Sequence, residues 1–106
     1  MGTYLNDVKA SVELTSSGRL QGLIAGSATN LGPIRIISIN AHLTGADGEI
    51  TIQDATAASG DIKIHLKGGS TSNDTLNFNF GGNGVYFGTG AYVTLAAIDS
   101  FTAYYG

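Results

Sequence analysis

The stretch GGNGVYFGTGAYVTLAAIDSFTAYYG, residues 81–106, holds six of the nine aromatic residues of the chain. Its glycine clusters bound short runs of valine, threonine, tyrosine and phenylalanine, a pattern typical of strands joined by tight turns. We predict two consecutive strands at residues 92–95 and 101–105, separated by a break at residues 97–100. These two strands are expected to complete the domain.

The rest of the chain carries the same signal at a spacing of about ten residues. Apolar residues alternate with polar residues in several short segments, which is the period-two pattern of strands with one buried face. The expected strands are residues 8–14, 20–28, 34–43, 49–53, 62–66 and 76–80. In the third segment the apolar phase changes between Ile36 and Ile37, which predicts a β-bulge or a bend in a long core strand.

Glycine-containing pairs and small polar residues mark the turns between these segments. Asp47-Gly48 and Asn83-Gly84 are the two-residue signals of tight hairpins. The expected loops are residues 16–18, 54–60 and 68–74. One helical turn around Ala57 is an alternative within the second loop, although it is too short to be stable alone.

A length of 106 residues suits one domain with one modest core. Eight or nine short strands without helical periodicity predict an all-β domain, either an antiparallel β-sandwich or a small barrel. We favour a jelly-roll-like antiparallel β-sandwich that spans residues 1–106. Residues 1–14 are expected to form an N-terminal arm or an edge strand.

The chain is poor in charge. Charged residues make up 12% of it, about half of the share in an average soluble domain. This composition fits a domain solvated mainly by hydroxyls and amides, or a subunit that buries much of its surface against neighbours. We favour the second interpretation because the cores of protein interfaces are depleted of charged residues.

The distribution of charge and the lack of cysteine limit the classes of function. The net charge is −3, and the five basic residues are scattered along the sequence. A nucleic-acid site needs clustered basic residues, so we expect no direct contact with nucleic acid. We find no apolar run long enough for a membrane span and no signal-peptide pattern, which predicts folding in a cytoplasm and no membrane partner. With no cysteine, disulfides and thiolate chemistry are excluded.

Candidate catalytic and metal-binding residues are few. His42 and His65 fall on the polar faces of predicted strands, and we interpret both as surface or interface histidines. Asp47, Glu49 and Asp54 are close in sequence, but they lack the alternating acids and distal glutamate of a calcium loop. We therefore predict a protein that is not an enzyme, with no catalytic residue, no cofactor and no metal site.

The aromatic residues of the C-terminal stretch are candidates for a contact surface, because tyrosine rings can stack on sugars or pack against other subunits. About half of them are expected in the core, since alternate residues of a strand point inward. The candidates are Tyr86, Phe87, Tyr92, Tyr104 and Tyr105. Asn77, Asn79 and Asn83 could supply hydrogen bonds to a sugar beside them.

Several stretches resemble small virion structural proteins of tailed bacteriophages, particularly those of aquatic phages. They are GPIRIISI at residues 32–39, GEITIQD at 48–54 with the small-residue loop to Gly60, GVYFGTGAYVTL at 84–95 and FTAYYG at 101–106. The resemblance covers residues 20–106, and it implies a non-enzymatic β-sandwich subunit of the particle. It defines no catalytic site.

Given this resemblance, the expected function is that of a capsid decoration or cement protein, which binds the outer shell as a symmetric homo-oligomer such as a trimer. Its partners would be the major capsid protein or other virion subunits, and its location the virion. The alternatives are a tail, fibre or head-to-tail adaptor subunit, and a carbohydrate- or host-surface-binding module. The residues expected to contact a partner are Tyr4, Leu5, Val8, Tyr86, Tyr92, Tyr104 and Tyr105.

Overall fold

The computed structural model describes residues 8–45, 47–68 and 75–106, and every helix or strand position in these ranges is a strand. The predicted all-β class with antiparallel sheets is confirmed. The described ranges hold eleven strands, where eight or nine were expected. They are β1 (Lys9–Ala10), β2 (Gly18–Arg19), β3 (Gln21–Ile24), β4 (Ser27–Asn30), β5 (Ile34–Leu43), β6 (Gly48–Asp54), β7 (Asp61–Gly68), β8 (Thr75–Asn79), β9 (Val85–Phe87), β10 (Ala91–Ala96) and β11 (Ile98–Tyr105). None of the described segments is a helix that could cross a membrane.

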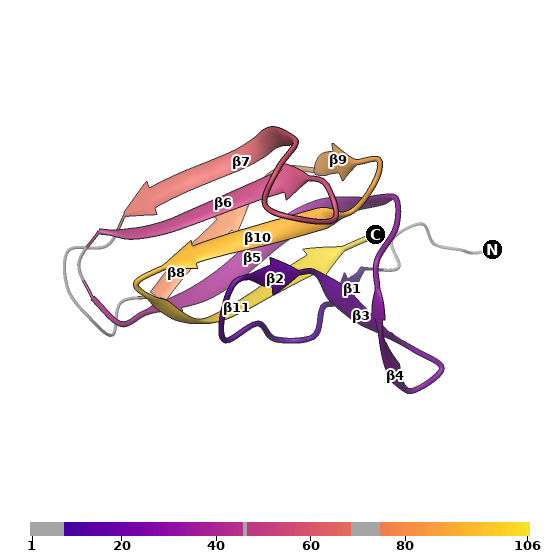
Figure 1. Ribbon diagram of the computed structural model, residues 1–106, viewed down its shortest axis with the longest axis horizontal. Helices are drawn as coiled ribbons and strands as arrows, with labels where there is room; N and C mark the ends of the chain where they lie inside the picture. Colours follow the sequence, from indigo (N-terminus) through magenta and orange to yellow (C-terminus); the bar gives the residue numbers. More distant parts are fainter. Residues whose placement is uncertain (1–7, 46, 69–74) are drawn as a thin grey trace.

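The strands form two main sheets and one separate hairpin (Figure 1). Sheet A has the order β1-β11-β5-β8, with β9 also paired to β5. Sheet B has the order β2-β10-β6-β7. Strands β3 and β4 pair only with each other among the described strands. We call sheets A and B together the body of the protein.

The strand pairs of the body are nested along the chain. β1 pairs with β11, β2 with β10, β5 with both β8 and β9, and β6 with β7, all antiparallel. Two further antiparallel ladders, β11–β5 and β10–β6, join these pairs into the two sheets. As a result, neighbours in sequence such as β5 and β6, or β10 and β11, lie in different sheets.

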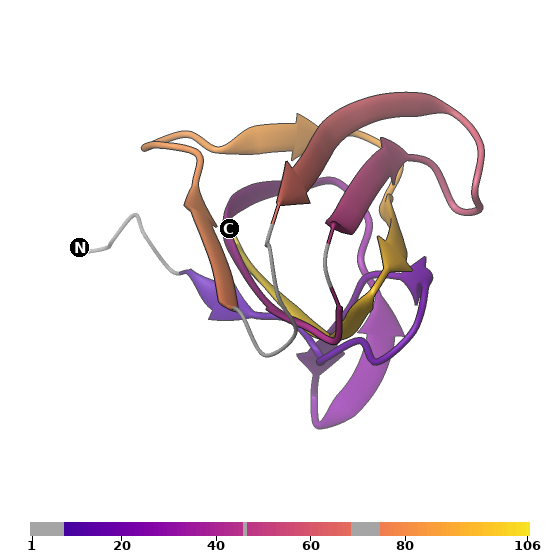
Figure 2. The same ribbon diagram turned by 90° about the vertical axis from the view of Figure 1, so that its left-hand side faces the viewer.

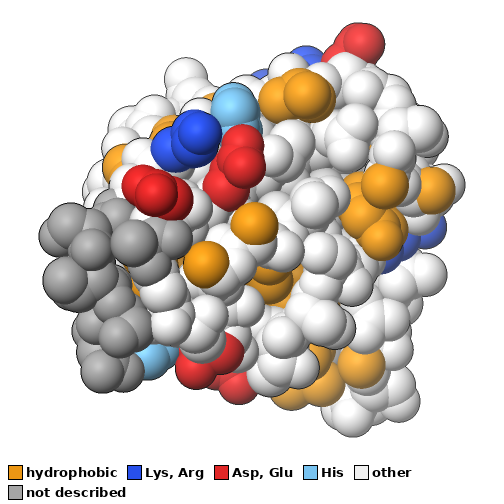
Figure 3. Space-filling view, turned by 60° about the vertical axis from the view of Figure 1, so that its left-hand side comes forward, with side chains coloured by type: hydrophobic (Ala, Val, Ile, Leu, Met, Phe, Trp, Pro, Cys, Tyr) orange, Lys and Arg blue, Asp and Glu red, His pale blue; other side chains and the backbone are white. Residues whose placement is uncertain are grey.

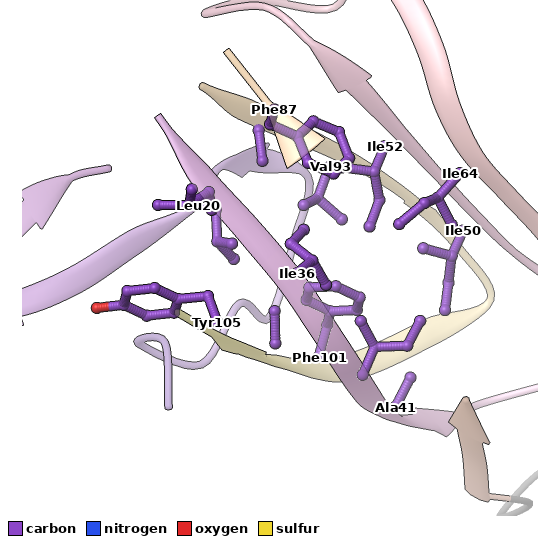
Figure 4. Packing of buried hydrophobic residues seen from close by; sticks show 14 of the residues in the cluster. Leu20, Ile36, Ala41, Ile50, Ile52, Ile64, Phe87, Val93, Phe101 and Tyr105 are labelled. Atoms are coloured by element: carbon purple, nitrogen blue, oxygen red, sulfur yellow. The ribbon is translucent and has the colours of Figure 1, made fainter. Parts of the chain in front are cut away.

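The inward-facing side chains of both sheets form one buried cluster (Figure 4). Ile36 and Phe101 come from sheet A, Ile52 and Val93 come from sheet B, and all four are fully buried. Figure 2, which views the molecule from its end, shows the strands of the two sheets arranged around a common centre. Removing this apolar surface from water is the main force that holds the sheets together.

β5 is the long core strand that the sequence predicts at residues 34–43. Its register against β11 shifts between the pair Tyr105–Ile36 and the pair Tyr104–Ser38, so Ile37 is an extra residue on β5. The predicted change of phase between Ile36 and Ile37 is therefore confirmed as a bulge-like irregularity. The bulge lets the strand turn buried side chains inward on both sides of the slip.

The other long strands follow the predicted segments with two differences. β6, β8, β10 and β11 occupy the expected positions, and the break before β11 is only Ala97, with φ of 56°. In β7 the expected alternation fails at Ile62, which is 60% exposed. The register against β6 moves directly from Ile64 to Ile62, so Lys63 is an extra residue and the inward phase is lost there.

Both predicted hairpins are wrong, although both turns exist. Asp47 has φ of 60°, but the strands beside it, β5 and β6, belong to different sheets. Gly84 donates its N–H to the carbonyl of Gly81, yet the flanking strands β8 and β9 both pair with β5 rather than with each other. A turn signal is local, whereas the choice of pairing partner depends on the whole core.

Two N-terminal predictions also need correction. Residues 20–28 do not form one strand, because a turn at Ala25 and Gly26 divides them into β3 and β4. The predicted strand 8–14 is a strand only at Lys9–Ala10, with an isolated bridge between Leu14 and Phe101. Val8 is 48% exposed and Ser11 is buried instead. Ser11 exchanges hydrogen bonds with the backbone of Ala103: its N–H donates to the carbonyl at 2.8 Å, and its hydroxyl accepts the Ala103 N–H at 2.9 Å.

Candidate interaction surfaces

The first candidate surface is the β3–β4 hairpin, which projects from the body (Figures 1 and 2). Ala25 and Gly26 form its tip with φ of 52° and 83°, as a two-residue type I′ turn requires. Leu23 is 65% exposed and Ile24 is 53% exposed. Successive residues of a strand point to opposite faces, so the hairpin presents an apolar side chain on each face next to its tip.

The base of the hairpin is fixed to the body. The Leu31 N–H donates to the carbonyl of Leu20 at 3.2 Å, and Nη2 of Arg19 donates to the carbonyl of Leu31 at 3.0 Å. A Cβ atom on Gly22 would overlap the hydroxyl of Tyr105 and come within 2.9 Å of Cδ2 of Leu31. Gly22 therefore allows β3 to lie directly against the end of β11.

The second candidate surface is the outer face of sheet A. Residues directly opposite each other on paired strands point to the same side, so the register sets outward side chains in three rows across β11, β5 and β8. All nine residues are exposed or half-buried, and all but one carry a neutral amide or hydroxyl group. The rows are Tyr104–Ser38–Asn79, Thr102–Asn40–Asn77 and Ser100–His42–Thr75. We call these nine residues the polar face.

Charged side chains lie at the two ends of this outer face. At one end the guanidinium carbon of Arg35 lies 5.1 Å from the centroid of the Tyr86 ring, a cation–π contact between paired residues of β5 and β9. At the other end Nδ1 of His42 lies 2.8 Å from Oδ1 of Asp99. The guanidinium of Arg35 and the carboxylate of Asp99 thus each have a partner within the chain.

The outer face of sheet B is different in character. Glu49 lies opposite Lys67 on the neighbouring strand, and its carboxylate is hydrogen-bonded to Nε2 of His65. That hydrogen bond, supported by the positive charges of His65 and Lys67, lowers the pKa of Glu49. Figure 3 shows one group of basic, acidic and histidine side chains close together, with other charged side chains scattered over a surface that is mostly uncharged. The two histidines thus occupy the surface positions predicted for them, at 37% and 48% side-chain exposure for His42 and His65.

Asp54 joins the loop before β10 to the end of β6. Its Oδ1 accepts the N–H of Thr89 at 2.8 Å and its Oδ2 accepts the N–H of Gly88 at 3.1 Å. These backbone N–H groups, that of Thr89 first, lower the pKa of Asp54. The carboxylate therefore has a structural role in the loop. Within the described ranges, no group of three or more histidine, cysteine, aspartate or glutamate residues is arranged to hold a metal ion.

The residues predicted to contact a partner do not form one surface. Tyr4 and Leu5 lie outside the described residues. Val8 precedes β1 at the edge of sheet A and is 48% exposed, and Tyr86 is 47% exposed on β9. Tyr104 belongs to the polar face and is half-buried. Val8, Tyr86 and Tyr104 thus all belong to sheet A or its edge.

The other two tyrosines lie elsewhere. Tyr92 is half-buried on the outward row of sheet B, where it pairs with Arg19 and Gln53. Tyr105 is only 6% exposed, because it continues the inward alternation of Phe101 and Ala103 along β11. The bulge in β5 places the buried Ile36 opposite it. Its ring packs in the core and against the hairpin base (Figure 4).

The weak pattern of residues 20–28 predicts one strand and gives no sign that Leu23 and Ile24 are exposed at a hairpin tip. Asn40 and Thr102 fall on the polar phase of predicted strands, and that phase could have identified them as surface residues. Comparisons with models of known protein families, with curated proteins and with solved structures each give no match. The case for a function therefore rests on the chemistry of these surfaces and on the resemblance described above.

Proposed function

We propose that this chain is a non-enzymatic structural subunit of a tailed-phage virion, namely a capsid decoration or cement protein that binds the outer shell as a symmetric homo-oligomer. The observation that carries the proposal is the β3–β4 hairpin, an anchored projection with exposed Leu23 and Ile24 at its tip. Exposed apolar groups on a projecting element favour contact with another protein. The low content of charge, 12%, fits a surface that is largely covered in an assembly.

We also propose that sheets A and B form a jelly-roll β-sandwich. The nested pairing supports this, because a jelly roll arises when one long antiparallel hairpin of four strand pairs folds over into two sheets. Pairs β1–β11 and β5–β8 would then join in sheet A, and pairs β2–β10 and β6–β7 in sheet B. Jelly rolls occur in viral capsid proteins and in lectins, so the fold suits the proposed role without specifying it.

The proposed attachment is binding without turnover. Leu23 and Ile24 would enter an apolar depression between neighbouring shell subunits, where full burial of each side chain contributes about 1.5–3 kcal/mol. The tight turn at Ala25 and Gly26 limits the freedom of the tip, which reduces the entropy lost on binding. A symmetric oligomer would repeat this contact, so that several weak contacts act together.

The direct experiment measures co-sedimentation of the purified chain with virions produced without it. The double variant Leu23→Ser, Ile24→Ser should lose affinity by on the order of a hundredfold, because about 3 kcal/mol of apolar burial disappears. Ile62→Ser is the matched control, since it removes an equally exposed isoleucine from β7 and should bind like the parent chain. Equal binding by all three proteins would remove the hairpin as the attachment element.

The N-terminal arm is a second proposed contact, and it is tested separately. A truncated chain that lacks residues 1–8 should bind the same virions less tightly than the full chain. If it binds equally well, the arm has no part in attachment, and the hairpin result still stands on its own.

A tail, fibre or adaptor subunit is the alternative within the virion. The copy number per purified virion, measured by quantitative mass spectrometry against the major capsid protein, separates the two. A decoration site repeats over the whole shell, so we expect on the order of hundreds of copies, whereas roughly a dozen would indicate a tail or vertex position. Complete absence from virions would overturn the structural role.

A further inference from the structure

The polar face of sheet A combines three properties. Its nine residues lie in cross-strand register, eight of them carry a neutral amide or hydroxyl group, and all are exposed or half-buried. Asn40, Asn77 and Asn79 are the exposed amides at its centre and edge. Strands are about 4.8 Å apart and alternate residues are about 7 Å apart along a strand, so the rows cover an area of about 10 by 14 Å.

This composition matches the hydrogen-bonding capacity of a sugar. Each asparagine amide both donates and accepts, and so does each serine, threonine and tyrosine hydroxyl. Oδ1 of Asn79 already accepts the N–H of Gly81 at 2.9 Å, which fixes this side chain and leaves its NH₂ group to donate to a ligand. Sugar hydroxyls likewise donate and accept, so either partner can adapt to the other. Polar side chains held on paired strands are also preorganised, which lowers the entropy lost when a ligand binds.

The arrangement of charge indicates a neutral ligand. The rows between the ends of the face contain no Asp, Glu, Lys or Arg side chain. Arg35 at one end is stacked on Tyr86, and Asp99 at the other end is bonded to His42.

We infer that the polar face binds a neutral oligosaccharide through Asn40, Asn77 and Asn79. A second copy of this chain is a poorer occupant, because the centre of a protein interface is more apolar than this face. The inference goes beyond the proposed attachment to the virion shell and does not depend on it. The hairpin would hold the subunit in place, and the polar face would give it a glycan-binding activity.

The test is a nuclear magnetic resonance titration of the full chain with four neutral probes: maltohexaose, cellohexaose, laminarihexaose and N-acetylchitohexaose. At about 10 mM sugar, which detects millimolar affinity, at least one probe should shift amide signals of β5, β8 and β11. Polygalacturonate serves as the anionic comparison and should bind less tightly than that probe. No shift with any neutral probe, or binding of polygalacturonate alone, would overturn the inference.

Two double variants locate the site. Asn77→Ala, Asn79→Ala should weaken binding about tenfold, because two side chains that each contribute about 0.5–1.5 kcal/mol are removed. Thr51→Ala, Thr94→Ala makes a matched change to a cross-strand pair on the outer face of sheet B and should leave the affinity unchanged. An unchanged affinity in the asparagine variant would contradict a glycan site. So would amide signals of the polar face that shift with protein concentration in the absence of sugar, because they would indicate that a second copy covers this face.

The same variants separate this inference from the proposed function. The asparagine variant should co-sediment with virions like the parent chain, while the Leu23→Ser, Ile24→Ser variant should keep the affinity for the sugar. Loss of both activities in one variant would mean that a single surface serves both, against the division described here.

Discussion

The body and the β3–β4 hairpin differ in where their large apolar side chains lie. The body buries most of its large apolar residues, as with Phe101 and Ile36 at 0% exposure, whereas the hairpin leaves Leu23 65% exposed. The hairpin is a two-stranded element, which is at best marginally stable alone in water, and it holds its shape through contacts at its base. The difference teaches that stability lies in the body, whereas the proposed partner contact lies at the tip, with Gly22 at the junction between them.

The largest expected effect comes from removing a central side chain of the body. Phe101→Ala should lower the free energy of unfolding by about 3–5 kcal/mol, since a fully buried ring leaves a cavity behind. Phe80→Ala is the control. Phe80 is only partly buried beside the core, so its substitution should lower the free energy of unfolding by less. Urea denaturation measures both. A loss below that of the control would show that the body does not depend on this cluster.

The next effect concerns the junction. Gly22→Ala places a methyl group against Tyr105 and Leu31, so we expect a loss of about 1–3 kcal/mol as for other overpacked sites. Gly32→Ala is a matched control on the other side of the hairpin, where an added Cβ meets nothing within 4 Å. Hydrogen exchange should show faster exchange of hairpin amides in the Gly22 variant. If both variants unfold at the same urea concentration, the close contact at Gly22 is not a constraint.

A smaller effect depends on pH and belongs to the body. The pKa of Asp54 is lowered in the folded chain by the N–H groups of Thr89, Gly88 and Gly90. A depressed folded pKa contributes stability above the unfolded value, about 3.9, and this contribution is lost as the pH falls through the folded value. Asp54→Asn should therefore be less stable than the parent chain at neutral pH, and the difference should shrink below about pH 4.

The pH experiment has a direct control. Asp47→Asn makes the same chemical change at an exposed aspartate with φ of 60°, a conformation that asparagine also adopts. Thermal unfolding from pH 2.5 to pH 7 measures both. If the difference in stability between Asp54→Asn and the parent chain stays constant across this pH range, the loss of stability comes from packing and not from the charge of Asp54.

The smallest expected change in stability comes from the tip. Leu23→Ser, Ile24→Ser should alter the free energy of unfolding by no more than about 0.5 kcal/mol, as is usual for exposed positions. The same variant is expected to show the largest loss in binding to virions. A strong loss of stability would show that the tip is packed in the isolated chain, and the contrast between body and hairpin would then fail.

Sequence patterns were enough to locate the strands that carry strong alternation. Ile50 and Ile52 on β6 alternate with Thr51, and the slip at Ile37 is visible as a change of apolar phase. These features are local, because the side chains of a strand with one buried face record which way each residue points. The all-β class follows from them.

Pairing and exposure could not be predicted in the same way. Asp47-Gly48 is a typical hairpin-turn pair, yet the strands on either side of it belong to different sheets, because both bury their apolar sides in a common core. Ser11 is buried because its hydroxyl accepts a backbone N–H from Ala103, a contact between residues far apart in the chain. The exposed Leu23 looks like a core residue in sequence, since apolar character alone does not distinguish a core from a binding tip.

The nesting of strand pairs also sets the order of events during synthesis. β11 lies between β1 and β5 at the centre of sheet A, so β1 and β5 cannot reach their shared neighbour until residues 98–105 have been made. At ribosomal rates, residues 98–105 are completed about 5–20 s after synthesis of the chain begins. Until then one edge of β5 has no strand beside it, so its backbone N–H and C=O groups are open to incorrect pairing. Translation that stalls before residue 98 would leave sheet A open.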